Sequence, residues 1–165
     1  PLGMSLLLGF KIRDMAADMA RLMLYLFAAL MGVSFSMIFV VFGLGSIVSA
    51  FMGAAVLFGT MTFYGYFTKR SLESVGQFMF VGLIAIIIAS IINIFIESSA
   101  MTMMISALAI IIFLGLTAYD TQQIREMVSV ENPEGNAEIV GALTLYMDFI
   151  NLFLNLLQLF GDKKE

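Results

Sequence analysis

The chain has 165 residues, of which 61% are hydrophobic and 12% charged, and its formal net charge is −4. Soluble globular domains carry about 25% charged residues, and the mean hydropathy here is +1.03, so the composition excludes an ordinary soluble domain and indicates an integral membrane protein. Cysteine and histidine are both absent. This excludes disulfides, thiolate or imidazole metal sites and histidine-based nucleophile systems. No basic cluster with interleaved aromatic residues occurs, so no nucleic-acid partner is expected.

The start of the chain contains a short apolar run at residues 5–10, which follows Pro1, Leu2, Gly3 and Met4. This run is far too short to span a bilayer. We interpret it as the end of a helix whose remainder lies upstream, or as an expression scar.

Islands of charged residues divide the rest of the chain into long apolar segments. Five spans are predicted, at residues 22–43, 46–67, 77–97, 100–124 and 138–161. Each has the roughly 20 to 25 residues that cross a hydrocarbon core of about 30 Å at about 1.5 Å per residue. Only helices satisfy their own backbone in lipid. The sequence therefore predicts an all-α, polytopic transmembrane helical bundle, with one real loop at residues 129–137.

The basic residues predict the orientation of these spans. One side of the membrane receives Lys11, Arg13, Arg21, Lys69, Arg70 and Arg125, and we expect this side to be cytoplasmic. The tail residues Lys163 and Lys164 then fall outside, which conflicts with the rule. Either the last segment crosses the membrane, or it re-enters and returns. Its length favours crossing, and crossing would make it a central pore helix.

Two carboxylates lie inside the predicted spans, Asp120 in the fourth and Asp148 in the fifth. They stand about eight and ten residues from the base of one hairpin, and so roughly 12 to 15 Å from it along each axis. They can therefore face each other. A carboxylate in hydrocarbon costs at least about 2.5 to 3.5 kcal/mol, which makes a functional role the default hypothesis. We expect the pair to share a proton.

Polar side chains form a stripe along the last span. It consists of Thr144, Asp148, Asn151, Asn155 and Gln158, spaced four, three, four and three residues apart and hence on one face of a helix. The third span has a shorter stripe of Ser90, Asn93 and Glu97. Each stripe is expected either to line a water-filled path or to form structural hydrogen bonds across helices. In the first case the two stripes would border one polar cavity. Glu97 is interpreted as an interfacial residue at a helix end, or as an ion-attracting group at the outer mouth.

Other polar and small residues favour structural roles. Ser46, Ala50 and Ala54, with Ser49 and Gly53 beside them, form small-xxx-small ridges that are typical of helix packing. The charged residues between the second and third spans are expected to form a solvated inner turn.

With these residues in view, the chain resembles the transmembrane Bax inhibitor motif family, in its bacterial branch. The resemblance covers nearly the whole chain. It rests on the order of several segments: Leu30-Met31-Gly32-Val33-Ser34, the entry at residues 46–51, Phe67-Thr68-Lys69-Arg70-Ser71-Leu72, Thr117-Ala118-Tyr119-Asp120-Thr121-Gln122 and Leu145-Tyr146-Met147-Asp148-Phe149-Ile150-Asn151-Leu152-Phe153.

The resemblance implies a seven-helix bundle associated with calcium leak across membranes and, in eukaryotes, with suppression of cell death. It also implies an aspartate pair on the last two helices that acts as a pH-sensing gate, and Asp120 and Asp148 match that pair. Residues 1–165 would then be a single transmembrane domain that lacks the first helix and most of the second. A basic residue on that second helix is expected to pair with one aspartate.

Two functions are therefore considered. The first is a calcium-permeable leak channel or exchanger of a bacterial inner membrane, gated by Asp120 and Asp148, which also serve as Ca²⁺ ligands. Its pore would be lined by Thr144, Asn151, Asn155, Gln158, Asn93 and Glu97. The alternative is a membrane-embedded regulatory or binding subunit for a protease or a cell-death or stress partner, with structural aspartates. No cofactor is expected, with Ca²⁺ only as the transported ion. An enzyme is not expected, because neither aspartate follows a glycine as in an intramembrane aspartyl protease.

Overall fold

The computed structural model describes residues 17–129 and 136–163 of the chain. The helices are α2 (Ala17–Phe35), α3 (Ile38–Val41), α4 (Leu44–Phe67), α5 (Glu73–Ile96), α6 (Ser99–Ser129) and α7 (Asn136–Phe160). No strand occurs in these residues, so the all-α fold class is confirmed. The N-terminal apolar run, Lys11, Arg13, Lys164 and the centre of the predicted loop lie outside the described residues.

Five helical segments are long and apolar enough to cross a membrane, as the sequence predicts. They are Arg21–Val41, Leu44–Phe67, Glu73–Ile96, Ser99–Val128 and Glu138–Phe160. The third begins four residues earlier than expected, and the fourth ends four residues later. Charged side chains such as Arg125 can reach water at the membrane interface. They therefore do not end a helix, whose backbone hydrogen bonds continue past them.

The first span is not one continuous helix, which corrects the prediction for residues 22–43. It turns at Ser36, whose backbone N–H is shared between the carbonyls of Gly32 and Val33, both at 3.2 Å. The Ser36 hydroxyl also donates to the Val33 carbonyl, at 2.6 Å. A serine hydroxyl that competes for backbone carbonyls favours a turn over a continuing helix, and the short helix α3 follows.

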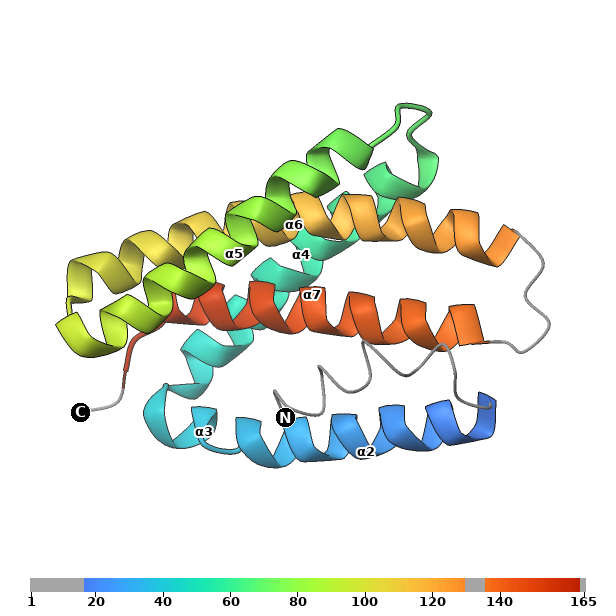
Figure 1. The fold of residues 1–165 in the computed structure, drawn as a ribbon. Coiled ribbons are helices and arrows are strands. Elements are labelled where there is room, and N and C mark those ends of the chain that lie inside the picture. The colour runs from blue at the N-terminus through green and yellow to red at the C-terminus, as the bar shows by residue number, and fades with distance from the viewer. Residues whose placement is uncertain (1–16, 130–135, 164–165) are drawn as a thin grey trace.

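The last helix lies at the centre of the described bundle. Figure 1 shows α6 and α7 running side by side, with α5 along α6 and α2 on the other side of α7. Helix α7 packs against α2, α4 and α6, and α6 packs against α4, α5 and α7. Because α7 continues without a break from one end of the bundle to the other, the geometry agrees with a crossing helix and not with a re-entrant one.

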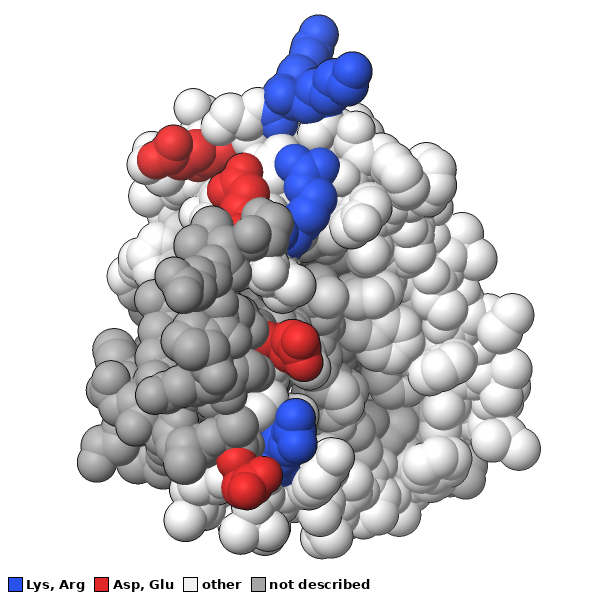
Figure 2. All heavy atoms as spheres, turned by 90° about the vertical axis from the view of Figure 1, so that its right-hand side faces the viewer, with Lys and Arg blue, Asp and Glu red and all other residues white. Residues whose placement is uncertain are grey.

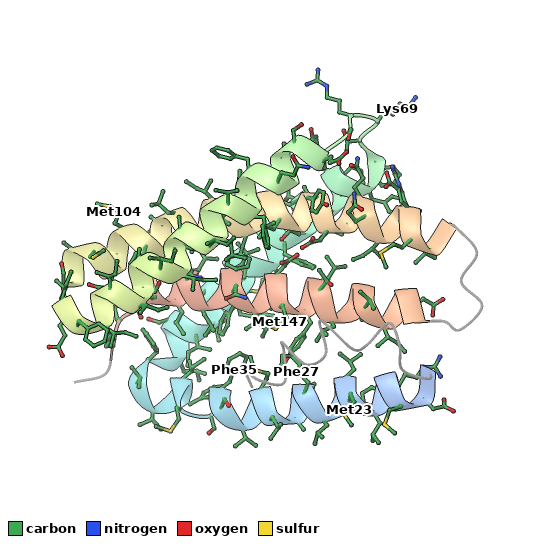
Figure 3. All side chains as sticks on the ribbon, viewed as in Figure 1. Met23, Phe27, Phe35, Lys69, Met104 and Met147 are labelled. Carbon is green, nitrogen blue, oxygen red and sulfur yellow. The ribbon has the colours of Figure 1, made fainter. Side chains whose placement is uncertain are left out.

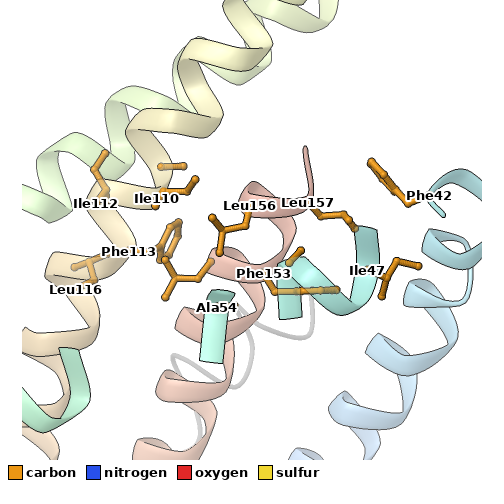
Figure 4. Packing of buried hydrophobic residues seen from close by; sticks show 13 residues of the cluster. Phe42, Ile47, Ala54, Ile110, Ile112, Phe113, Leu116, Phe153, Leu156 and Leu157 are labelled. Carbon is orange, nitrogen blue, oxygen red and sulfur yellow. The ribbon is translucent and has the colours of Figure 1, made fainter. Parts of the chain in front are cut away.

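Two apolar clusters hold the helices together. The larger joins α4, α6 and α7 around Ala54, Phe113 and Leu152 (Figure 4). The smaller joins α2 to α7, where Phe27 is fully buried beside Leu143; Figure 3 shows how the side chains lie between these two helices. In a bilayer such contacts stabilise chiefly through close packing, since lipid tails are as apolar as the side chains.

Glycines let helices approach closely along the second half of α6. A Cβ added to Gly65 of α4 would overlap the backbone of Ala118, and one added to Gly141 of α7 would lie 2.9 Å from Cγ2 of Ile124. Real Cβ atoms do not tolerate such distances in a packed interior. The stretch of α6 around Asp120 is thus held closely by its neighbours.

Charged residues gather at one end of the bundle, which we call the basic end. The start of α2, the connection between α4 and α5, the end of α6 and the start of α7 meet there (Figure 1). This end carries Arg21, Lys69, Arg70 and Arg125 together with acidic residues, and Figure 2 views it directly. The opposite end holds Glu97, Asp162 and Lys163. This distribution matches the two sides predicted from the sequence.

The segment after α7 returns to the start of α4 at the opposite end. The Gly43 N–H donates to the Asp162 carbonyl at 3.3 Å, and the Asp162 N–H donates to the Ser46 hydroxyl at 2.8 Å. Phe42 and Lys163 form an antiparallel bridge. Lys163 therefore lies at the end of the bundle opposite to the other described basic residues.

Candidate functional site

The two intramembrane aspartates meet between α6 and α7. The side chains of Asp120 and Asp148 lie against each other, close enough for a hydrogen bond when one of them carries a proton. An ionised carboxylate can only accept hydrogen bonds, so a hydrogen bond between the two groups needs a proton on one of them. The arrangement therefore allows the two carboxyl groups to share one proton between the last two helices.

The two carboxyl groups differ in their access to the surroundings. Asp148 is buried, with 4% of its surface exposed, and its Oδ2 atom has no hydrogen-bond partner among the described residues. Asp120 is only half-buried. A buried polar atom without a partner costs about 1 to 3 kcal/mol, so Asp148 retains an acceptor oxygen that a proton donor or a cation would satisfy.

Hydroxyl groups on the same turns of α6 bond to their own helix. Thr117 and Thr121 are buried, and their hydroxyls donate to the carbonyls of Phe113 at 2.6 Å and of Thr117 at 2.7 Å. Their hydrogens are thus used within α6. Neither of these two hydroxyls donates to the aspartate pair.

A contact that the sequence analysis did not predict fixes α6 to the connection between α4 and α5. The buried side chain of Gln122 accepts a hydrogen bond from the Leu72 N–H at 2.9 Å and donates one to the Arg70 carbonyl at 2.8 Å. Nearby, the Arg125 guanidinium donates to the Tyr66 carbonyl and lies 6.0 Å from the centre of the Tyr66 ring. An amide two residues after an intramembrane aspartate is the sequence signal that could have drawn attention to Gln122.

The polar stripe of α7 forms hydrogen bonds within its own helix, whereas the hydrogen bonds considered from the sequence were to neighbouring helices. Thr144, Asn151 and Asn155 each donate to the carbonyl four residues earlier on α7, at 2.8, 2.8 and 2.7 Å. The expected hydrogen bonds across helices are therefore not the ones these donors make. The reason is local, because the preceding carbonyl is within reach of a short polar side chain without any neighbouring helix.

The stripes of α5 and α7 border one polar cavity of about 420 Å³ at the opposite end, between α5, α6 and α7. We call it the α5–α6–α7 cavity. Four of the predicted pore residues line it, namely Asn93, Glu97, Asn155 and Gln158, together with Ser90, Ile94, Ser99, Thr102, Ile105 and Ser106. Thr144 and Asn151 are not among its lining residues.

The turn between α5 and α6 shapes the rim of this cavity. Glu97 ends α5 in the left-handed backbone conformation, with φ of 56°, and its N–H donates to the Asn93 carbonyl at 2.7 Å. The Asn93 side chain donates to the Thr102 hydroxyl at 2.7 Å and accepts from the Ser98 N–H at 3.1 Å. Asn93 is therefore a structural link of the hairpin as well as a cavity residue.

A second hollow, of about 710 Å³, lies beside the small-residue ridge of α4. Ala54 of the ridge is fully buried, while Ser46, Ser49 and Gly53 line the hollow together with the end of α7. The ridge thus packs against other helices only in part.

No group of three or more Asp, Glu, His or Cys side chains capable of holding a metal ion occurs within residues 17–129 and 136–163. The aspartate pair supplies two carboxyl groups. The assignment of Asp120 and Asp148 as Ca²⁺ ligands stays a prediction.

Comparison with known proteins identifies the family. Residues 1–165 match the family described as "Inhibitor of apoptosis-promoting Bax1". The chain is 39% identical over 168 residues to the Inner membrane protein YbhL of Escherichia coli, an alignment that covers 99% of this chain and 72% of YbhL. It is 38% identical over 171 residues to a protein of Rickettsia prowazekii, covering all of this chain and 71% of that protein, and 40% identical over 138 residues to a membrane protein of Streptococcus pyogenes, covering 82% and 60%. The protein is therefore a polytopic membrane protein that belongs to the Bax inhibitor family.

Proposed function

We propose that the chain is a pH-sensitive calcium leak channel or exchanger of a bacterial inner membrane, and that the Asp120–Asp148 pair is its gate. The observation that carries this proposal is the close approach of the two carboxyl groups inside the helical bundle, where they can share a proton. Membership of the Bax inhibitor family supports a role in the membrane, and the similarity to YbhL supports the location.

The closed state follows from the shared proton. With one proton between them, the pair carries a single negative charge and links α6 to α7 by a hydrogen bond to a charged acceptor, a kind of bond worth about 1.5 to 3 kcal/mol. The bonds of Gln122 hold the same part of α6 to the Arg70–Leu72 backbone. Both contacts keep the helices together at this level.

Loss of the proton removes the link and replaces it with repulsion. Two unit charges about 4 Å apart repel by about 4 kcal/mol at an effective dielectric constant of 20. Either α6 and α7 separate, or a cation enters to balance the charge. Carboxylate oxygens are hard ligands that suit Ca²⁺, and Oδ2 of Asp148 has no hydrogen-bond partner among the described residues that a bound ion would have to displace. Calcium flux should therefore be low in acid and should rise as the pH increases.

A polar route leads from the pair toward the opposite end of the bundle. Asn151, Asn155 and Gln158 follow Asp148 on one face of α7, and ten residues of helix rise about 15 Å. Two of these residues border the α5–α6–α7 cavity. An ion leaving the pair in this direction would thus meet amide groups and not lipid-like side chains.

The test is calcium flux into liposomes that contain the purified chain. We expect flux to increase with pH in the wild type, and the response to disappear when Asp120→Asn and Asp148→Asn are combined. Glu73→Gln is the matched control, because Glu73 is an exposed carboxylate at the start of α5; this variant should keep the wild-type profile. An unchanged pH profile in the double variant would refute the gate.

The alternative, a regulatory subunit with structural aspartates, predicts a different result. It predicts no flux from the purified chain at any pH, and a membrane protein that co-purifies with it. Comparing flux of Ca²⁺, Na⁺ and K⁺ in the same liposomes also tests the ion that the proposal names.

A further inference from the structure

We propose that the α5–α6–α7 cavity is a low-affinity binding site for hydrated divalent cations, with Glu97 as its only anionic ligand. This proposal rests on the proposed function in one respect, which is that the bound cation is the Ca²⁺ ion that crosses the membrane. The cavity has a volume of about 420 Å³ and receives oxygen-bearing side chains from all three helices.

The first argument is that lining side chains of the cavity have oxygen acceptors that remain available to a ligand. The Ser90 hydroxyl donates its hydrogen to the Ile86 carbonyl at 2.7 Å, and the Asn155 amide donates to the Asn151 carbonyl at 2.7 Å. Their oxygens remain as acceptors for which the described residues supply no donor. A hydroxyl whose hydrogen is already in use presents its oxygen to a ligand, and the Asn155 amide keeps its oxygen as an acceptor beside one further N–H. A hollow lined in this way favours a cation over an anion.

The second argument is charge. Glu97 is the only ionisable residue that lines the cavity, and it makes no ion pair with any described basic residue. Arg21, Lys69, Arg70 and Arg125 lie at the other end of the bundle, and the basic residue described at this end, Lys163, follows the acidic Asp162 and does not line the cavity. The Glu97 carboxylate at the rim therefore attracts positive ions, and no basic side chain among the lining residues competes with them for it.

The third argument is affinity and position. Calcium sites take six to eight oxygen ligands, and affinity falls as the number of charged ligands decreases. One carboxylate with neutral oxygens and water gives weak binding, which suits a conducting site that must release its ion. Asn155 lies seven residues, about two helical turns, beyond Asp148 on the same face of α7. An ion in the cavity is therefore about 10 Å along the axis from the gate.

The test uses Mn²⁺ as a paramagnetic probe of the purified chain in lipid nanodiscs. Ile94 and Ile105 line the cavity, and Ile139 lies near the start of α7 at the basic end. We expect Mn²⁺ to broaden the methyl signals of Ile94 and Ile105 but not that of Ile139, and Ca²⁺ to reverse the broadening.

Variants identify the ligand. Glu97→Gln should raise the Mn²⁺ concentration needed for half-broadening by about tenfold or more, since ligand charge sets affinity, and Glu97→Asp should retain most of the binding. Asp162→Asn is the matched control, because Asp162 is an exposed carboxylate at the same end but does not line this cavity. An unchanged Ile139 signal verifies that each variant is folded.

Three outcomes would overturn the site: no selective broadening in the wild type, equal broadening in Glu97→Gln, or the same loss in Asp162→Asn, which would indicate general surface attraction. Flux separates this proposal from the gate. If the pH response is present but Mn²⁺ does not bind, only the cavity site fails. If Mn²⁺ binds and the aspartate variants leave the pH profile unchanged, only the gate fails.

Discussion

Gly76 of α5 lies directly against the ring of Tyr119 on α6, one residue before Asp120. A Cβ added to Gly76 would lie 2.5 Å from Cγ of Tyr119, a distance that the rigid base of an aromatic side chain cannot relieve by a small rotation. Adjacent residues of a helix point about 100° apart. By fixing Tyr119 against α5, this contact also fixes the rotation of α6 that directs Asp120 toward α7.

Gly76→Ala should therefore weaken both the bundle and the gate. Overpacking at such a position costs about 1 to 3 kcal/mol. We expect a lower midpoint of thermal unfolding in detergent and calcium flux that persists at a lower pH than in the wild type. Gly59→Ala is the control, since nothing lies within 4 Å of a Cβ at that position of α4. A normal midpoint and pH profile in Gly76→Ala would contradict this interpretation.

The single variant Asp148→Asn should lock the gate closed. An asparagine amide donates to an ionised Asp120 without needing a proton, so the link between α6 and α7 no longer depends on pH. Flux should stay at the acid level of the wild type across the pH range. The measurement is the same liposome assay, and a retained rise with pH would show that the shared proton is not the switch.

Gln122→Leu should loosen the connection between α4 and α5. The substitution leaves the Leu72 N–H and the Arg70 carbonyl without their side-chain partners, and each lost partner costs about 1 to 3 kcal/mol. Hydrogen exchange of the Leu72 amide should accelerate by about tenfold or more. The neighbouring substitution Gln123→Leu, at a less buried position, should leave this amide unchanged; equal acceleration in both variants would argue against a specific contact.

The orientation can be measured because the chain contains no cysteine. A single cysteine at Lys163 should react with an impermeant thiol reagent applied to intact cells, whereas one at Lys69 should react only after permeabilisation. These positions lie at opposite ends of the bundle. The reverse labelling pattern would overturn the predicted orientation while leaving the fold unchanged.

The parts of the structure that depend on long-range composition could be predicted from the sequence. Apolar runs and charged islands specify five spans, because the hydrocarbon thickness imposes a minimum length. Helical periodicity placed Asn93, Glu97, Asn155 and Gln158 on faces that meet at one cavity. Hairpin arithmetic placed Asp120 and Asp148 at one level, and the structure brings their side chains together. Their role as a gate stays a prediction.

The parts of the structure that depend on individual atomic contacts could not be predicted from the sequence. The turn at Ser36 has no glycine or proline signal, and it arises from one hydroxyl competing for a carbonyl. The Gln122 contact joins positions fifty residues apart, which no local pattern reveals. Periodicity also cannot say whether a polar side chain on a helix face bonds to its own backbone or to a neighbour. For Thr144, Asn151 and Asn155 the sequence indicated a water-filled path or bonds across helices, whereas their donors bond to carbonyls of their own helix.

These internal bonds bear on how the last helix enters the bilayer during synthesis. A polar side chain costs less in lipid when it donates a hydrogen to its own backbone, so Thr144, Asn151 and Asn155 depend less on neighbouring helices being in place. Asp148 is different, because its partner lies on α6. The two helices are consecutive in the chain, and we expect the translocon to release them into lipid as one hairpin, with the carboxyl groups already joined.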